Sequence, residues 1–220
     1  MSLSKIHVYL MPGMAANSSI FKNISLPEDL FEQHLLDWFV PEKGMTLSAY
    51  AQKMCEKVKH KNAVIMGVSF GGILVQEMAK CMSFRQVIII SSVKTKEELP
   101  KRLIFARYTK IHKLLPTGVV NNLELVSKYA FGEVVTKRLE LYEEYLSIRD
   151  KYYLDWSIDQ IVNWSQSSYH PDIVHIHGEK DVVFPIHHIK NCIVVEKGTH
   201  TMIIHRYKWF NERLPAIILD

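Results

Sequence analysis

A serine between glycines is the first feature of this sequence that could carry out chemistry. The segment Gly67-Val68-Ser69-Phe70-Gly71 has G-x-S-x-G spacing, in which a strand turns at once into a helix and exposes a strained serine. The residues two before and two after the serine must be small, because the two backbones nearly touch. Backbone N–H groups and the positive end of a helix dipole would stabilise an anion developing there. The pattern therefore suits a nucleophile, although an ordinary N-capping serine in a glycine-rich turn would also fit it.

Short apolar strands and amphipathic helices alternate around this serine. Compact apolar runs predict strands at residues 6–11, 34–40, 63–68, 86–91, 172–177 and 192–196. The clearest helix follows Thr46, a plausible N-cap, with an apolar stripe formed by Leu47, Tyr50, Ala51, Met54, Cys55 and Val58. A final amphipathic helix places Ile203, Tyr207, Phe210 and Leu214 on one side. This alternation predicts an α/β fold with a mostly parallel central sheet and helices on both faces.

The polar motifs of the sequence follow the predicted strands, at the carboxyl ends where such sheets bind ligands. They are Pro12-Gly13, Ser69, Ser91-Ser92, Gly178–Asp181 and Gly198–His200. Because each motif falls at the same edge of one sheet, we expect them to meet there.

Strand signals disappear between residues 95 and 166, where amphipathic helical stretches take over, including one carried by Val135, Leu139, Tyr142 and Leu146. We interpret 95–166 as a helical lid inserted within a single domain that spans residues 1–220. Its aromatic side chains could line an apolar pocket, but their helical spacing favours core packing between lid and sheet: Phe105, Tyr108, Tyr129, Phe131, Tyr142, Tyr145, Tyr152, Tyr153, Trp156 and Trp164.

The charge of the chain is concentrated near this insertion. Residues 94–151 hold 12 Lys and Arg against 8 Asp and Glu, which equals the formal net charge of +4. That excess could attract an anionic substrate group, or it could be an ordinary solvated helical surface.

The composition narrows the class of protein. With 48% apolar and 23% charged residues, the chain suits one globular domain. No apolar run approaches the roughly 20 residues of a membrane span, and the N-terminal stretch is interpreted as a strand and not a signal peptide. The odd set of three cysteines, Cys55, Cys81 and Cys192, predicts free thiols in a reducing cytoplasm. No H-E-x-x-H or C-x-x-C spacing predicts a metal site.

Four motifs in order resemble those of the α/β-hydrolase superfamily, in particular its small serine hydrolases with a helical lid. Pro12-Gly13-Met14 follows the first strand, Gly67–Gly71 is the nucleophile elbow, His177–Asp181 follows a late strand, and Gly198-Thr199-His200 follows the last one. The resemblance covers nearly the whole chain except the lid. Pro12 stands where the family commonly has a histidine.

This resemblance implies a role for each residue. Ser69 would be the nucleophile, His200 the base that takes its proton, and Asp181 the carboxylate that orients His200. The backbone N–H groups of Met14 and Phe70 would form the oxyanion hole. Glu179 and His205 are nearby rivals for the acid and the base, while His175 and His177 share one strand face and are expected to be packed polar residues.

The sequence therefore predicts a cytoplasmic serine hydrolase that cleaves a carboxylic ester or related acyl bond through an acyl-enzyme. Its partners would be a small acyl substrate and water, with no cofactor, no metal and no nucleic acid. A thioesterase, lactonase or C–C hydrolase stays open, since one triad can serve them all. So does a ligand receptor or interaction module that keeps the fold with little turnover. Oligomeric state is not predicted.

Overall fold

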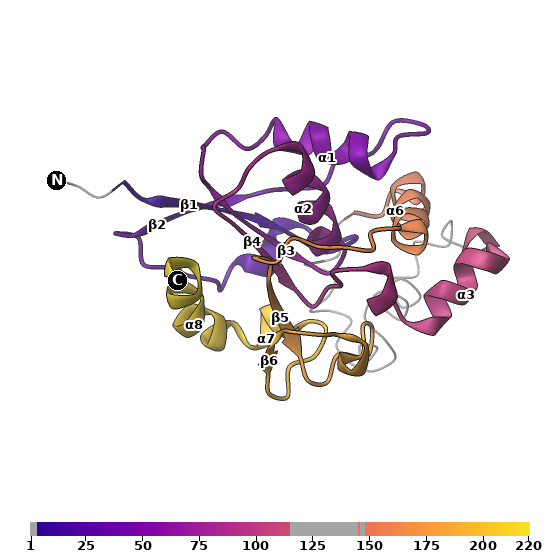
Figure 1. The fold of residues 1–220 in the computed structure, drawn as a ribbon. Coiled ribbons are helices and arrows are strands. Elements are labelled where there is room, and N and C mark those ends of the chain that lie inside the picture. The colour runs from indigo at the N-terminus through magenta and orange to yellow at the C-terminus, as the bar shows by residue number, and fades with distance from the viewer. Residues whose placement is uncertain (1–3, 115–144, 146–147) are drawn as a thin grey trace.

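A six-stranded parallel sheet forms the centre of the protein. The computed structural model describes residues 4–114, 145 and 148–220. The strands are β1 (Ile6–Met11), β2 (Phe31–Leu35), β3 (Val64–Val68), β4 (Gln86–Ile90), β5 (Val174–Gly178) and β6 (Ile193–Val195). Their order is β2-β1-β3-β4-β5-β6, and every neighbouring pair is parallel (Figure 1). The predicted α/β fold with a parallel sheet is confirmed.

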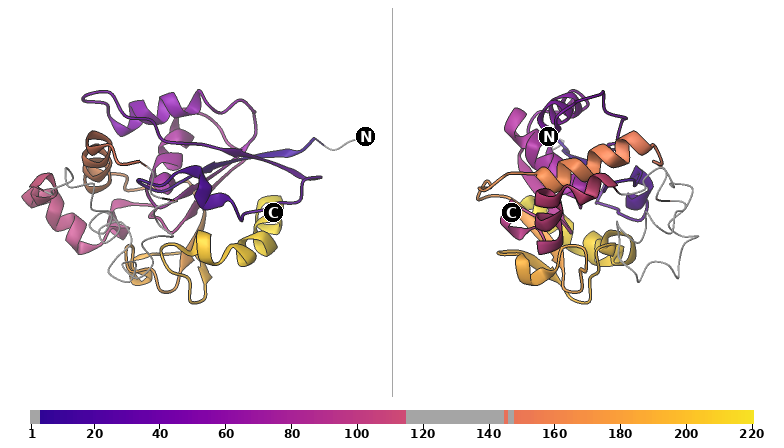
Figure 2. Two further views of the ribbon diagram at one scale, coloured as in Figure 1. Left: turned by 180° about the vertical axis from the view of Figure 1, so that it is seen from behind. Right: turned by 90° about the vertical axis from the view of Figure 1, so that its right-hand side faces the viewer.

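Helices cover both faces of this sheet. They are α1 (Leu47–Cys55), α2 (Phe70–Cys81), α3 (Lys101–Thr109), α6 (Lys151–Asn163), α7 (Met202–His205) and α8 (Tyr207–Leu219). In Figures 1 and 2, α1 and α2 lie on one face and α8 on the other, while α3 and α6 lie beyond the end toward which β1 runs. Within the described residues, no helix is both long and apolar enough to cross a membrane.

The central strands are held by burial on both faces. All five residues of β3 are buried, and Ile88, Ile89 and Ile90 of β4 are fully inaccessible. Each buried Val, Ile or Met side chain among them contributes about 1.5–3 kcal/mol relative to exposure. On the covering layer, Thr46 caps α1 by accepting a hydrogen bond from the Ala49 N–H (3.2 Å), as predicted. The apolar runs predicted at 63–68 and 86–91 therefore form the two central strands, β3 and β4.

Predicted strand limits elsewhere differ by at most two residues, but three predicted boundaries were wrong by more. The second strand is Phe31–Leu35 instead of 34–40, because an edge strand is buried on one face only and its polar alternation hides it. The first helix ends at Cys55, so Val58 lies in the turn that follows. The last helical segment is divided at Arg206 into α7 and α8.

In the described residues between β4 and β5, all regular secondary structure is helical. It contains α3, α6 and the short 3-10 helices Lys96–Glu98 and Ile111–Leu114. The helix predicted around Val135–Leu146 falls, apart from Tyr145, outside the described residues, as do Tyr129 and Phe131. The other aromatic side chains of this segment fall into a buried group and an exposed group. Tyr145, Tyr153, Trp156 and Trp164 are buried, whereas Phe105, Tyr108 and Tyr152 are exposed. The role of this segment as a lid stays a prediction.

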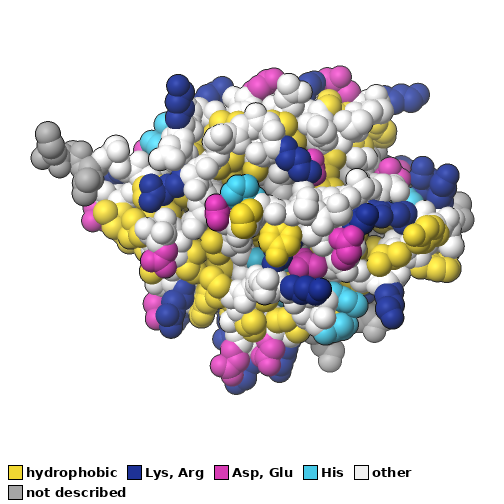
Figure 3. Space-filling model, viewed as in Figure 1, with side chains coloured by type: hydrophobic (Ala, Val, Ile, Leu, Met, Phe, Trp, Pro, Cys, Tyr) yellow, Lys and Arg dark blue, Asp and Glu magenta, His cyan; other side chains and the backbone are white. Residues whose placement is uncertain are grey.

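Some basic residues of this region serve the fold. Lys94 is buried (1% exposed) and donates to the main-chain carbonyls of Lys190 and Asn191, with Glu98 3.9 Å away. Arg107 donates to the carbonyls of Val162 and Trp164. On the face in Figure 3, basic and acidic side chains are interspersed. Part of the positive charge of this region therefore binds main-chain carbonyls and a carboxylate of the protein itself.

Candidate active site

Ser69 occupies a strained turn between β3 and α2. Its φ of 53° and ψ of −120° lie outside the regions that ordinary residues prefer, and such strain is typical of functional sites. Ser69 is at the N-cap position of α2, yet its side chain makes no capping hydrogen bond. The hydroxyl is instead 2.9 Å from Nε2 of His200. Ser69 is therefore not an ordinary helix-capping serine.

Close backbone contacts explain the glycines around Ser69. A Cβ on Gly67 would lie 2.3 Å from the Gly71 carbonyl oxygen, and one on Gly71 would lie 2.3 Å from the Pro12 carbonyl oxygen. Real Cβ atoms do not approach so closely. Gly71 therefore brings the loop after β1 against the start of α2, next to the serine.

The two candidate oxyanion donors lie on either side of this contact. Phe70 is the first residue of α2, so its N–H is among those without an acceptor inside the helix. Met14 follows Gly13, which lies beside the serine, because a Cβ on Gly13 would be 3.4 Å from Cβ of Ser69. Trp38 connects the two sides, because its indole N–H donates to the Gly13 carbonyl (2.9 Å) while its ring stacks on Phe70 (4.9 Å between centroids).

His200 reaches Ser69 from the loop that follows β6. That loop lies against the end of β5, because the Lys180 N–H donates to the Gly198 carbonyl (2.7 Å) and a Cβ on Gly178 would lie 2.5 Å from the same oxygen. The Nδ1 atom of His200 is 2.9 and 3.1 Å from the two carboxylate oxygens of Asp181. A carboxylate can only accept, so Nδ1 carries the proton and Nε2 accepts from the Ser69 hydroxyl.

Asp181 is buried and held by the main chain. Its Oδ1 accepts hydrogen bonds from the N–H groups of Val183 (2.8 Å) and Phe184 (2.9 Å). Burial alone would raise the pKa of this carboxyl, but attraction and hydrogen bonding from His200, with smaller contributions from His177 and the Phe184 N–H, lower its pKa overall. Asp181 is therefore an anion across the neutral range, as an orienting carboxylate needs to be.

Two buried histidines extend this arrangement behind Asp181. His177 Nε2 is 2.8 Å from the Phe184 carbonyl and 3.5 Å from Asp181, while His177 Nδ1 is 3.1 Å from Nε2 of His175. Burial, the largest influence, lowers the pKa of His177, and it lowers the pKa of His175 to about 2 with help from His177 and Lys94. Both rings are neutral packed groups, as expected from the sequence.

Phe184 is the contributor that sequence reasoning missed. Its N–H binds Asp181, its carbonyl accepts from His177, and its ring meets His200 edge-on at 5.6 Å. Trp38 was also missed. Ser92 was expected at this edge together with Ser91 but without a role, and its hydroxyl donates to the Ser69 carbonyl (2.7 Å). Neither Phe184 nor Trp38 belongs to a spaced motif, so only the position after Asp181 could have drawn attention to Phe184.

The rivals considered in the sequence lie elsewhere. Glu179 is exposed and accepts from the Lys197 N–H (2.8 Å), and His205 is exposed on α7. Two further histidines that belong to no motif, His187 and His188, form a ring pair in the 3-10 helix Ile186–His188. Of the predicted residues, the structure thus brings together Ser69, Asp181 and His200.

Comparisons with known proteins find likeness in structure and none in sequence. No protein-family model matches the chain, and no curated protein matches it. An esterase from Exiguobacterium antarcticum is 17% identical, with a TM-score of 0.72 over 99% of this chain and 93% of that one. A bromoperoxidase from Bacillus anthracis is 17% identical, with a TM-score of 0.69 over 99% and 93%. Est816, an N-acyl homoserine lactone degrading enzyme, is 16% identical, with a TM-score of 0.66 over 97% and 93%. With its parallel sheet and these neighbours, the chain has the α/β-hydrolase fold.

Proposed function

We propose that this protein is a serine hydrolase that cleaves a carboxylic ester or related acyl bond through an acyl-enzyme. The observation that carries the proposal is the continuous series of hydrogen-bond distances from Ser69 Oγ through His200 to Asp181. A serine hydroxyl is a weak nucleophile until a base in such contact can take its proton.

The proposed reaction has two halves. In the first, Ser69 Oγ attacks the acyl carbon, its proton passes to Nε2 of His200, and the leaving alcohol departs with that proton. In the second, water attacks the acyl-enzyme, again giving a proton to His200, which returns it to Ser69 as the acid leaves. Asp181 stabilises the imidazolium formed in both halves.

The negative charge of each tetrahedral intermediate needs preorganised donors. We assign that role to the N–H groups of Phe70 and Met14, which flank the contact between Gly71 and Pro12. Each such donor is worth about 3–4 kcal/mol in comparable enzymes. Support for this assignment comes from Trp38, which fixes the Gly13 carbonyl and the Phe70 ring together.

A fluorophosphonate probe and short p-nitrophenyl esters test the proposal directly. We expect the wild type to be labelled at Ser69 and to turn over the esters, and Ser69→Ala to do neither. His205→Gln is the matched control for His200→Gln, because both remove a histidine from the same stretch. A wild type that neither reacts with the probe nor hydrolyses any ester would refute the proposal.

The bond that is cleaved is the finer question. A lactone is a specific second candidate, because Est816 has this fold and degrades N-acyl homoserine lactones. A panel of esters, thioesters and lactones of increasing acyl length would distinguish these classes. Stoichiometric labelling of Ser69 without turnover of any member would instead favour a ligand receptor on the same fold.

A further inference from the structure

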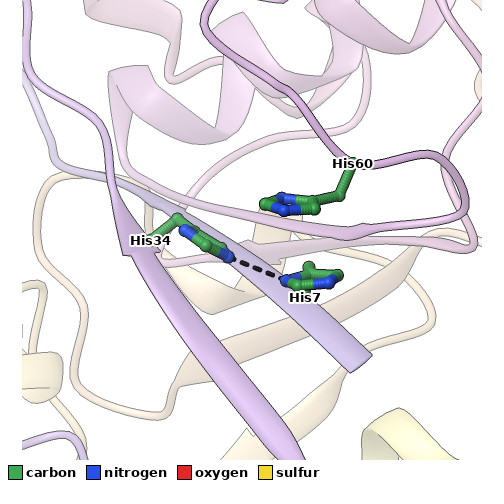
Figure 4. Close-up of side chains that lie close together, drawn as sticks. All are labelled: His7, His34 and His60. Atoms are coloured by element: carbon green, nitrogen blue, oxygen red, sulfur yellow. Dashed lines mark hydrogen bonds between the residues drawn. The ribbon is translucent and has the colours of Figure 1, made fainter. Parts of the chain in front are cut away.

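Three histidines lie together beside the β1–β2 pair, away from the carboxyl ends of the strands where Ser69 lies. His7 is on β1, His34 is on β2, and His60 is in the loop between α1 and β3 (Figure 4). One nitrogen from each ring lies within 4.8 Å of the other two. His7 is four residues before the end of β1, or roughly 13 Å along the strand, so this cluster is separate from the candidate active site.

Strand register places two of these histidines and one carboxylate on the same face of the sheet. His7 pairs with Glu32, and the next residue on that face, Tyr9, pairs with His34. Because alternate residues of a strand share a face, His7, Tyr9, Glu32 and His34 converge, and the His60 loop covers them. The side chains of His7 and His34 are 24% and 22% exposed, so a small ion can reach them from solvent.

The spacing of the donor atoms matches a tetrahedral metal site. Nδ1 of His7 and Nε2 of His34 are 3.0 Å apart. The two carboxylate oxygens of Glu32 face one ring each, with Oε2 3.6 Å from His7 Nδ1 and Oε1 3.7 Å from His34 Nε2. Ligands about 2.0–2.1 Å from a tetrahedral Zn²⁺ are about 3.3 Å from one another. These three groups are therefore already close to the distances at one face of such a tetrahedron.

His60 is placed to complete the set. Its ring now stacks on that of His7, with centroids 3.5 Å apart and planes at 8°. Its Nδ1 is 2.8 Å from the Tyr9 hydroxyl, which also accepts the Lys59 N–H (2.9 Å). With Nδ1 donating to Tyr9, Nε2 is left to bind a metal once the ring turns out of the stack. A histidine ligand commonly has such an outer partner, which fixes its tautomer.

The electrostatics of the cluster suit a cation in place of protons. Three imidazoles whose nitrogens lie within 4.8 Å of one another would repel each other if all were protonated. A metal needs neutral imidazoles. Glu32 supplies a negative charge to offset that of the ion.

We propose that His7, His34, His60 and Glu32 form a binding site for Zn²⁺. Imidazole nitrogens select ions of this type, whereas Mg²⁺ and Ca²⁺ prefer sets made only of oxygen. The ion would connect edge strand β2, its neighbour β1 and the loop that leads into β3. Its role would therefore be to stabilise this end of the sheet, independently of the hydrolase function proposed above.

The test is metal binding by the untagged, chelator-treated full chain. After dialysis against Zn²⁺ we expect one ion per chain, a higher melting temperature, and no comparable rise with Mg²⁺ or Ca²⁺. Co²⁺ in the same site should show the visible absorption of a tetrahedral complex. We expect His34→Gln to weaken Zn²⁺ binding at least about tenfold, whereas His188→Gln, which alters the ring pair on Ile186–His188, should leave it unchanged.

Three results would overturn the proposal. They are a wild type that takes up no stoichiometric Zn²⁺, undiminished binding in His34→Gln, and a loss of binding in His188→Gln instead. Circular dichroism would check that His34→Gln is folded. If it is not, Glu32→Gln replaces it, since that change keeps the shape of an exposed side chain (51%) and removes its charge. Unchanged affinity in a folded Glu32→Gln would then refute the four-ligand site.

Discussion

The central sheet holds two polar clusters of different construction, one beyond the carboxyl ends of β3, β5 and β6 and one on the β1–β2 pair near the amino end of β1. At the carboxyl end, Asp181 and His200 are almost wholly buried, and Asp181 is anchored by two main-chain N–H groups. At the amino end, His7 and His34 are partly exposed and bonded mainly to side chains. Main-chain hydrogen bonds hold the Asp181 carboxylate of the first cluster in place, as the proposed reaction requires. The second consists of rings that can turn, which suits capture of an ion.

The largest expected effect separates the two clusters by activity. Asp181→Asn should lower kcat for ester hydrolysis by about 10⁴-fold, because the amide no longer holds His200 in the required tautomer. His34→Gln should leave that rate within about twofold, because His34 is on edge strand β2, two strands from β3, and is level with Ile65, four residues before Ser69. Initial rates with a p-nitrophenyl ester measure both. Equal losses in the two variants would show that the ends are coupled.

The next effect tests the backbone contact that defines the carboxyl end. Gly71→Ala forces a Cβ to within 2.3 Å of the Pro12 carbonyl oxygen, and we expect it to cost about 3 kcal/mol of unfolding free energy. Gly44→Ala is the matched control. Its φ of +79° is strained for alanine but nothing lies within 4 Å, so about 1 kcal/mol is expected. Urea unfolding measures the two, and equal costs would contradict the contact argument.

A third effect concerns protons at the carboxyl end. The pKa of His175 falls from 6.5 to about 2 on folding, chiefly through burial. Below about pH 6.5 the unfolded chain therefore binds a proton that the folded chain excludes, and stability is lost as pH falls, by about 1.4 kcal/mol per pH unit. His175→Gln should reduce this slope by that amount.

Urea unfolding at several pH values between roughly 6 and 5 would measure the slope. His170→Gln is the control, because its side chain is 71% exposed and should leave the slope unchanged. A His175→Gln slope equal to that of the wild type would contradict the assignment of the neutral ring.

The smallest effect belongs to the histidine cluster at the amino end. Tyr9→Phe removes the hydroxyl that contacts His60, and we expect Zn²⁺ affinity to weaken about tenfold. Tyr50→Phe also removes a buried hydroxyl, one that bridges the N–H and carbonyl of Phe39, so it controls for a general loss of stability. Calorimetric titration would compare them, and equal changes would argue against the outer-partner role of Tyr9.

Much of the fold was readable from sequence because burial and local pattern agree in the central strands. The runs at Ile6–Met11 and Gln86–Ile90 are apolar and sit between other strands, so the predicted and observed limits differ by at most one residue. Edge strand β2 was misplaced because its residues alternate and its apolar continuation, with Leu36 and Trp38, leaves the sheet to pack inward.

The sequence by itself determined the order of motifs after parallel strands, and hence that Ser69, Asp181 and His200 would share one edge. This follows because parallel strands bring all their carboxyl ends to the same side. Tertiary structure alone decided what surrounds them. Phe184 holds Asp181, His177 and His200 together through contacts that no spacing encodes.

The histidine cluster shows the same limit more strongly. Successive members of the set His7, His34 and His60 are 27 and 26 residues apart and come from two strands and a loop, so no metal motif links them in the chain. Only the register of β1 with β2 and the path of the loop before β3 bring their nitrogens together. Local sequence sets which face a side chain takes, but pairing between distant segments decides which side chains meet.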